Sequence, residues 1–150
     1  MIVFSRILAV VAVTGLGGAG AMAQETIGSY YAALGPQDYV NSKGARLRDF
    51  GAILQQDRAN YHRFNRRDPQ DQGDPFFGDA QRRAMIPALF AAGNNGWWNQ
   101  HGVTPPTSAP LDADVLVIIC TRNKMLSHII VNHANGDGYN TCEGNVTAGD

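Results

Sequence analysis

The chain has 150 residues, with 12 lysine and arginine side chains, 13 aspartate and glutamate side chains and a formal net charge of −1. This near-neutral balance argues against nucleic-acid binding, which depends on positive charge. The length suits a single domain with a hydrophobic core of its own. No motif in the sequence identifies a protein family.

Residues 1–23 have the three-part layout of a secretory signal peptide. Arg6 precedes an apolar run from Ile7 to Val13, and the segment ends in an A-x-A motif at 21–23. The apolar run is too short for a good membrane span, and no later run approaches that length. We therefore expect the mature protein, residues 24–150, to be periplasmic or secreted and to have no membrane span.

The mature segment is predicted to form one small α+β domain with a helical part at 24–102 and a strand part at 111–150. Between these parts, residues 103–110 read "VTPPTSAP" and carry three prolines. Such a composition favours an extended connection. Because this connection is short, it indicates an internal linker rather than a boundary between two domains.

The helical part is predicted to contain a short helix at 25–34 and two main helices. Asp49 is a candidate N-cap for a helix from Phe50 to about Phe64. Asp79 is a candidate N-cap for the second main helix, in which Met85, Leu89 and Ala92 form an apolar stripe and which Gly93 ends. Pro87 interrupts that stripe, so it should either kink the helix or begin a new one.

The strand part contains two β-branched apolar runs, at 114–121 and 125–133, separated by the turn residues 122–124. This pattern predicts an antiparallel hairpin. Apolar residues occur on both faces of the first run, which indicates that both faces are covered. The two main helices are thus expected to pack on a short antiparallel β-hairpin sheet, with Tyr139 to Cys142 as a candidate third strand.

Cys120 and Cys142 are the only cysteines. An even number of cysteines in an exported protein favours a disulfide, and their spacing is far from that of a redox-active C-x-x-C pair. In a simple meander, the first and third strands would lie roughly 9 to 10 Å apart. Disulfide-bonded cysteines usually have Cα atoms within about 7 Å. We therefore favour the disulfide over the third strand.

The segment "QQDRANYH", residues 55–62, contains several side chains that enzymes use for acid–base chemistry. On a helical wheel, Asp57 falls near the middle of the apolar stripe that includes Phe50. A carboxylate there is costly unless it is hydrogen-bonded or paired. The structural interpretation is that Asp57 accepts hydrogen bonds from a turn or pairs with Arg46 or Arg48. The functional interpretation is a carboxyl of raised pKa in a pocket. We favour the structural one.

The histidines give little support for catalysis. His62 falls outside the apolar stripe and is expected to be a solvated helix residue. His128 and His133 are five residues apart on one predicted strand, so they should point to opposite faces. His62 and His128 remain the candidates for a histidine that works with Asp57. No short metal-binding motif such as H-E-x-x-H is present, so no metal site and no cofactor are predicted.

Two loops rich in acidic or amide side chains depart from the ligand spacing of calcium sites. The aspartates at 68, 71 and 74 are spaced by three, whereas calcium loops use alternate positions. In "HANGDGYNTCEG", residues 133–144, the first position is not acidic and Glu143 stands one place early. Both loops are interpreted as solvated turns, with calcium binding as the less favoured alternative.

Trp97, Trp98 and His101 form the strongest candidate binding surface. The two tryptophans follow the polar, glycine-rich stretch 93–96. Adjacent aromatic rings in such a loop can stack on a sugar or on partner side chains. The alternative, which we favour, is that one ring covers the edge of the core while the other is partly exposed.

Three functions are compatible with these observations, the last of which is a purely structural envelope protein. The first is an exported accessory protein that binds a protein, a glycan or an envelope component, with no recognisable catalytic constellation. The second is a small exported hydrolase that uses Asp57 with a histidine as acid and base, which would need a cleft reaching Asp57. The oligomeric state is not indicated by the sequence.

Overall fold

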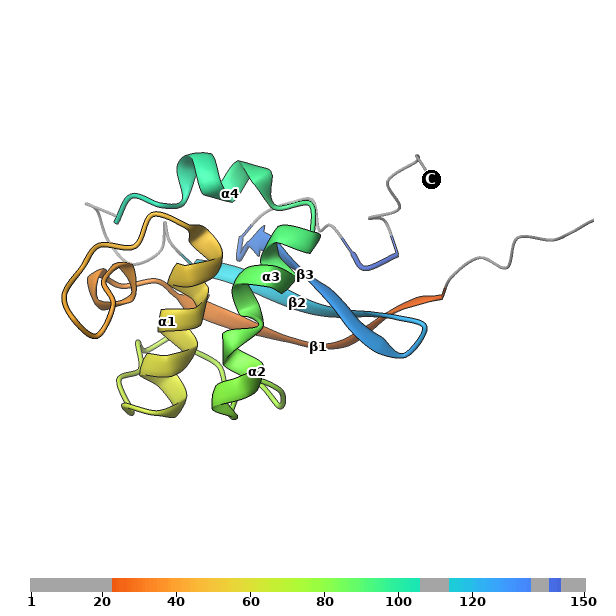
Figure 1. The fold of residues 1–150 in the computed structure, drawn as a ribbon, viewed down its shortest axis with the longest axis horizontal. Coiled ribbons are helices and arrows are strands. Elements are labelled where there is room, and N and C mark those ends of the chain that lie inside the picture. The colour runs from red at the N-terminus through yellow and green to blue at the C-terminus, as the bar shows by residue number, and fades with distance from the viewer. Residues whose placement is uncertain (1–22, 106–113, 136–140, 144–150) are drawn as a thin grey trace, which may run out of the picture.

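The computed structural model describes residues 23–105, 114–135 and 141–143. Within these ranges the chain forms an α+β fold, with a three-stranded antiparallel sheet, four α-helices and one 3-10 helix. Figure 1 shows the helices gathered on one side of the sheet. Residues 1–22 of the predicted signal peptide, 106–110 of the predicted linker and 139–140 of the candidate third strand lie outside the described residues.

The sheet has the order β1-β2-β3, with β1 at Gln24–Ala33, β2 at Asp114–Arg122 and β3 at Met125–His133. The predicted hairpin of β2 and β3 is confirmed. Its two turn residues, Asn123 and Lys124, have φ angles of 52° and 64°, the left-handed conformation that matches the twist of a two-residue hairpin. The sheet is larger than a hairpin because β1 pairs with the other edge of β2.

The prediction of a short helix at 25–34 is wrong, because this segment is strand β1. Its residues include Thr26, Ile27, Tyr30 and Tyr31, which are β-branched or aromatic and suit a pleated surface. β2 is apolar on both faces and buried almost throughout, as expected of a central strand that needs a partner on each edge. Pairing with β2 therefore outweighs any local helical tendency of the segment.

The two main helical regions are confirmed with their capping residues. Helix α1 spans Phe50–His62, and the Asp49 side chain accepts a hydrogen bond from the backbone N–H of Ala52 at 2.9 Å. The second region is divided at Met85 into α2, Ala80–Ala84, and α3, Ile86–Ala92. Pro87 occupies the first turn of α3, where its missing N–H costs little. Two further helices were not predicted, namely η1 at Pro36–Tyr39 and α4 at Gly96–His101.

The main core lies between the sheet and the helices, with fully buried side chains from all three strands and from α1 and α3. A second, smaller core on the other side of the sheet contains Ile118, Ile130 and the disulfide between Cys120 and Cys142. The disulfide has a Cα–Cα distance of 5.6 Å. It is consistent with folding in an oxidising compartment. The expected conflict was between this disulfide and a meander in which the segment at 139–142 is a strand of the sheet. It does not arise, because the strand that completes the sheet beside β2 and β3 is β1.

Side chains from α4 and from the loop before it form hydrogen bonds with the outer edge of β3. The Asn95 side chain donates to the Ile129 carbonyl at 2.8 Å and accepts from the Val131 N–H at 2.9 Å. The Trp98 indole N–H donates to the Val131 carbonyl at 2.8 Å. These bonds replace a neighbouring strand and so protect an edge that could otherwise pair with another chain.

The outer edge of β1 is covered in a similar way by the loop after α1. The backbone N–H of Gln72 donates to the Tyr31 carbonyl at 2.9 Å, and the Ala33 N–H donates to the Asp71 carboxylate at 2.9 Å. In the part of the chain that the structure describes, no helix has the length and apolar character needed to cross a membrane.

Candidate functional site

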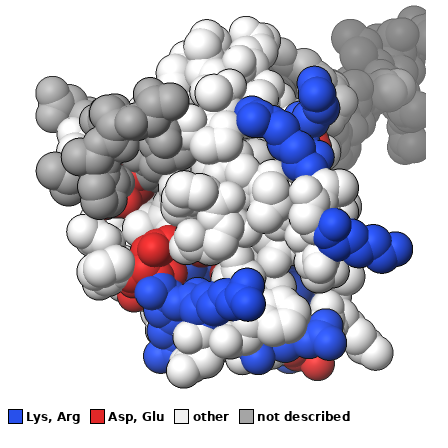
Figure 2. Space-filling model, turned by 90° about the vertical axis from the view of Figure 1, so that its left-hand side faces the viewer, with Lys and Arg blue, Asp and Glu red and all other residues white. Residues whose placement is uncertain are grey.

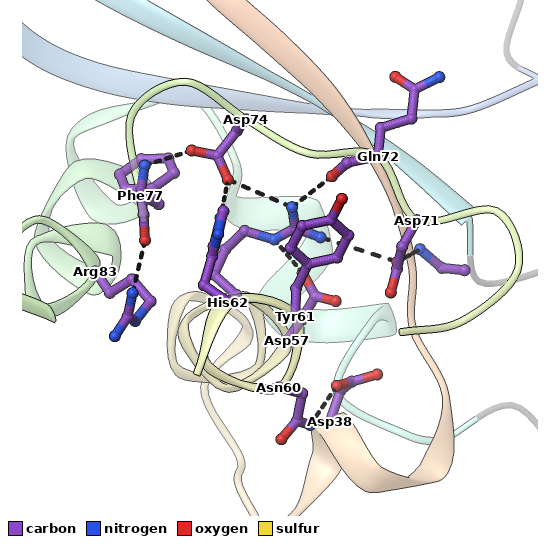
Figure 3. A network of polar contacts seen from close by, with 12 residues as sticks. Asp38, Asp57, Asn60, Tyr61, His62, Asp71, Gln72, Asp74, Phe77 and Arg83 are labelled. Carbon is purple, nitrogen blue, oxygen red and sulfur yellow. Dashed lines mark hydrogen bonds and ion pairs between the residues drawn. The ribbon is translucent and has the colours of Figure 1, made fainter. Parts of the chain in front are cut away.

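Arg58 lies at the centre of a buried polar network between α1, β1 and the loop at 71–77. Figure 3 shows its partners Asp57, Asp71, Gln72 and Asp74. The Nε of Arg58 donates to the Asp57 carboxylate at 2.7 Å, and its Nη1 donates to the Gln72 carbonyl at 2.7 Å. Nη1 also lies 3.4 Å from Asp74, and Nη2 lies 3.9 Å from Asp71. A single guanidinium thus links three carboxylates from two segments of the chain.

Aromatic rings enclose the same guanidinium. Its central carbon lies 4.2 Å from the ring centroid of Tyr30 and 4.7 Å from that of Tyr61. A cation over a ring face is attracted by the ring quadrupole, and the attraction is stronger away from water. Arg58 is fully buried, so both the ion pairs and the ring contacts act in a medium that screens them weakly. The arrangement ties β1, α1 and the following loop together.

The carboxyls of this region titrate differently because their environments differ. Burial raises the pKa of Asp38 to about 8, with a further contribution from the charge of Asp57. Burial also raises the pKa of Asp57 to about 6, although Arg58 opposes the shift. For Asp74 the hydrogen bonds from His62 and from the backbone N–H groups of Phe76 and Phe77 outweigh its burial and lower its pKa.

The structure places Asp57 in the core, as the helical wheel predicted, with 1% of its surface exposed. Its hydrogen-bond partner is Arg58, the next residue along the chain, and not Arg46 or Arg48. Arg46 instead donates to the Val103 carbonyl. The sequence pattern did not single out Arg58, because an arginine at the border of an apolar stripe is ordinarily solvated.

The thermal stability of the protein is expected to fall as the pH rises from about 4 to 8. The folded pKa values of Asp38 and Asp57 are above the 3.8 of the free side chain, so folding favours their protonated forms. This contribution is complete below pH 3.8 and is lost as the pH rises through about 6 and about 8. Asp38→Asn keeps this position uncharged at every pH. Over that range its melting temperature should therefore fall several degrees less than that of the wild type.

The control for this experiment is Asp49→Asn, which changes an exposed carboxylate and preserves a good N-cap residue. It should reproduce the pH slope of the wild type in circular-dichroism melts. Asp74 affects a different range, since its lowered pKa means that its contribution is lost only in acid. Parallel curves for Asp38→Asn and the wild type between pH 4 and 8 would contradict a buried, protonated Asp38.

Within the described residues, no hydrogen bond joins either candidate catalytic histidine to Asp57, and His62 is connected to it only through Asp74 and Arg58. His62 is partly buried rather than solvated, and its Nε2 donates to the Asp74 carboxylate at 2.7 Å. His128 is buried in β3 opposite Cys120, where its Nδ1 lies 2.8 Å from the Ser127 hydroxyl. Burial and the charge of Arg122 lower the pKa of His128.

Trp97 and Trp98 have different environments. Trp98 is buried, stacks on Phe50 with ring centroids 5.0 Å apart and caps the edge of β3. Trp97 is 50% exposed. Its ring stacks on His101 at a centroid distance of 4.5 Å and an interplanar angle of 19°. The favoured interpretation of the pair, one ring at the core edge and one partly exposed, agrees with this placement.

His133 completes this aromatic group, which we call the Trp97 surface: Trp97, His101, His133 and the adjoining ring of Trp98. The His133 ring lies 4.9 Å from Trp97 and 4.5 Å from Trp98, measured between centroids. His101 Nδ1 donates to the Trp97 carbonyl at 2.9 Å, which leaves Nε2 as the nitrogen available to a ligand. The sequence pattern does not place His133 beside Trp97, because His133 lies on β3, far from Trp97 along the chain.

Within the described ranges, no group of three or more histidine, cysteine, aspartate or glutamate side chains is placed to hold a metal ion. The loop at 133–144 falls only partly within those ranges. No family model, no curated protein and no solved structure matches this chain.

Proposed function

We propose that this protein is an exported binding protein that recognises a glycan through the Trp97 surface. The observation that carries the proposal is the half-exposed indole of Trp97 fixed against the His101 ring. A hydrogen bond from His101 to the Trp97 carbonyl, and the anchoring of Trp98 to β3, hold the surface in place. A surface ordered before the ligand arrives loses less conformational entropy on binding.

The surroundings of Trp97 favour a glycan over a protein partner. Cores of protein interfaces are usually enriched in apolar and aromatic residues. The exposed side chains next to Trp97 in the chain are polar, namely Asn94, Asn99, Gln100 and His101. One flat aromatic ring among hydrogen-bonding groups suits a sugar, whose ring offers both C–H groups and hydroxyls.

Export of the protein is part of the same proposal. It is supported by the leader-like sequence of residues 1–23 and by the disulfide between Cys120 and Cys142. The alternative of a hydrolase is less well supported. Its proposed acid–base residue, Asp57, is 1% exposed and held by Arg58, so a substrate has no direct contact with that carboxyl in this conformation.

Trp97→Ala is expected to weaken oligosaccharide binding by at least about tenfold, since truncating a central aromatic contact commonly costs about 2 kcal/mol. The probes are soluble oligomers of β-linked glucose, N-acetylglucosamine and xylose, measured by calorimetry with the mature protein. Met125→Ala is the matched control, because Met125 is also an exposed apolar residue. Its variant should bind like the wild type.

The melting temperature of Trp97→Ala should stay close to that of the wild type, because about half of the residue is already exposed. If none of the three oligomers binds, or if binding survives in Trp97→Ala, the proposal of a glycan site at Trp97 is wrong. Binding of a partner protein that needs Trp97 and is unaffected by the oligomers would assign the surface to a protein instead.

A further inference from the structure

A polar pocket of about 220 Å³ lies beside the C-terminal half of α1. It is lined by η1 and the segment that follows it, by α1 and by the loop that follows α1, and it shares no residue with the Trp97 surface. The lining includes Gln37, Asn41, Ser42, Gln56, Phe64 and Arg66. Pockets for drug-sized ligands are about 300 to 1,000 Å³, so this one suits a smaller molecule.

Local hydrogen bonds fix two of the walls. The Asn41 side-chain oxygen accepts from the backbone N–H groups of Lys43 and Ala45 at 2.9 and 3.0 Å, which closes a tight turn. On the other side, the backbone N–H of Arg66 donates to the Asn60 carbonyl at 2.9 Å. The pocket is therefore formed before any ligand binds, which lowers the entropy cost of binding.

The protein uses only part of the hydrogen-bonding capacity of the lining. The Gln56 amide nitrogen donates to the Asn60 oxygen at 3.0 Å, and the Gln37 amide nitrogen donates to Asp68 at 2.6 Å. Across the described residues, no hydrogen bond engages Gln56 Oε1, Gln37 Oε1 or Asn41 Nδ2. These atoms provide two acceptors and one donor. The exposed Ser42 hydroxyl can both donate and accept a hydrogen bond.

Arg66 adds a positive charge at this pocket. Its side chain is exposed and, within the ranges that the structure describes, forms no ion pair. The guanidinium carbon lies 6.0 Å from the centroid of the Phe64 ring, which is 41% exposed. Figure 2 shows basic side chains, with acidic ones beside them, along the lower part of the face that it draws.

We propose that this pocket binds a single acidic sugar unit, such as a uronic acid. Sugar hydroxyls both donate and accept, which matches the mixed set of free amide and hydroxyl groups. The planar fork of an arginine matches a carboxylate in two parallel hydrogen bonds. The exposed Phe64 ring offers an apolar surface to the C–H face of the sugar. This site goes beyond the proposed function, because it involves no part of the Trp97 surface.

The test is an NMR titration of the ¹⁵N-labelled mature protein with D-glucuronate, and with D-glucose as the neutral control. Glucuronate is expected to shift the amide signals of Asn41, Ser42, Gln56 and Phe64, with glucose at least tenfold weaker. Arg66→Gln should weaken glucuronate binding at least tenfold, because a hydrogen bond to a charged group contributes about 1.5 to 3 kcal/mol. Arg67→Gln, at a neighbouring exposed arginine outside the pocket lining, should change binding less than twofold.

Equal losses in Arg66→Gln and Arg67→Gln would overturn the proposal, because they would indicate unspecific attraction to positive charge. Glucose binding as tightly as glucuronate, or no shift at the pocket signals, would overturn it as well. Trp97→Ala should leave glucuronate binding unchanged. The result for this pocket is therefore separate from the result for the Trp97 surface.

Discussion

Arg58→Met is expected to destabilise the protein by about 3 to 5 kcal/mol at neutral pH, the usual cost of removing one partner from a buried ion pair. Asp57, Asp71 and Asp74 would keep their buried positions and lose the cation that links them. The Tyr30 and Tyr61 rings would also lose the guanidinium that they enclose. Chemical unfolding in urea, followed by circular dichroism, measures the loss.

The variant should recover part of its stability as the pH is lowered. Without the guanidinium the pKa values of the carboxyls rise, so folding favours their protonated forms and stability increases towards acid. Arg58→Lys retains the charge without the planar fork and should lie between Arg58→Met and the wild type. Arg63→Met, at an exposed position, should cost less than about 0.5 kcal/mol. A fully stable Arg58→Met at pH 7.5 would contradict the structural role of the network.

Loss of the disulfide is expected to cost about 3 kcal/mol in the chain-entropy model. Cys120 and Cys142 are separated by 22 positions in the sequence, and both are fully buried. The bond attaches the segment at 141–143 to the C-terminal half of β2, on the side of the sheet away from the main helices. The double variant Cys120→Ala/Cys142→Ala should therefore melt well below the wild type, by roughly 10 °C for a domain of this size.

Dithiothreitol provides the internal control. It should lower the melting temperature of the wild type towards that of the double variant and leave the double variant itself unchanged. Mass spectrometry after alkylation confirms the oxidation state in each sample. A wild type whose melting temperature does not respond to complete reduction would show that the bond does not contribute to stability.

The elements with local signals could be predicted from the sequence. Asp49 and Asp79 are side-chain caps at the starts of α1 and α2, and Pro87 marks the start of α3. The hairpin of β2 and β3 followed from two apolar runs and a short polar turn. In each case the determining interactions lie within a few residues of one another, so the pattern is visible in the chain itself.

The elements set by distant contacts could not be predicted. β1 forms because β2 has a free edge, although the two are separated by most of the chain. The sequence pattern extends the first main helix to about Phe64, but α1 ends at His62 and Phe64 is 41% exposed. Asn95 reads as a loop residue in the sequence, whereas its amide pairs with the edge of β3.

The candidate site could also be predicted only where its residues are close together in the sequence. The sequence identified Asp57 as a buried carboxylate, yet the network around it needs a loop more than ten residues further on, at 71–74. It also identified Trp97 and His101, which are one helical turn apart. His133 joined them only through the packing of α4 beside β3.

The most direct test compares oligosaccharide binding and melting temperature in Trp97→Ala and Asp57→Asn. If recognition belongs to the Trp97 surface and the charged network serves the fold, Trp97→Ala loses binding at an unchanged melting temperature. Asp57→Asn then keeps the affinity of the wild type while its melting temperature changes. A folded Asp57→Asn that no longer binds, beside a Trp97→Ala that still does, would contradict this division of roles and return Asp57 to the centre of the function.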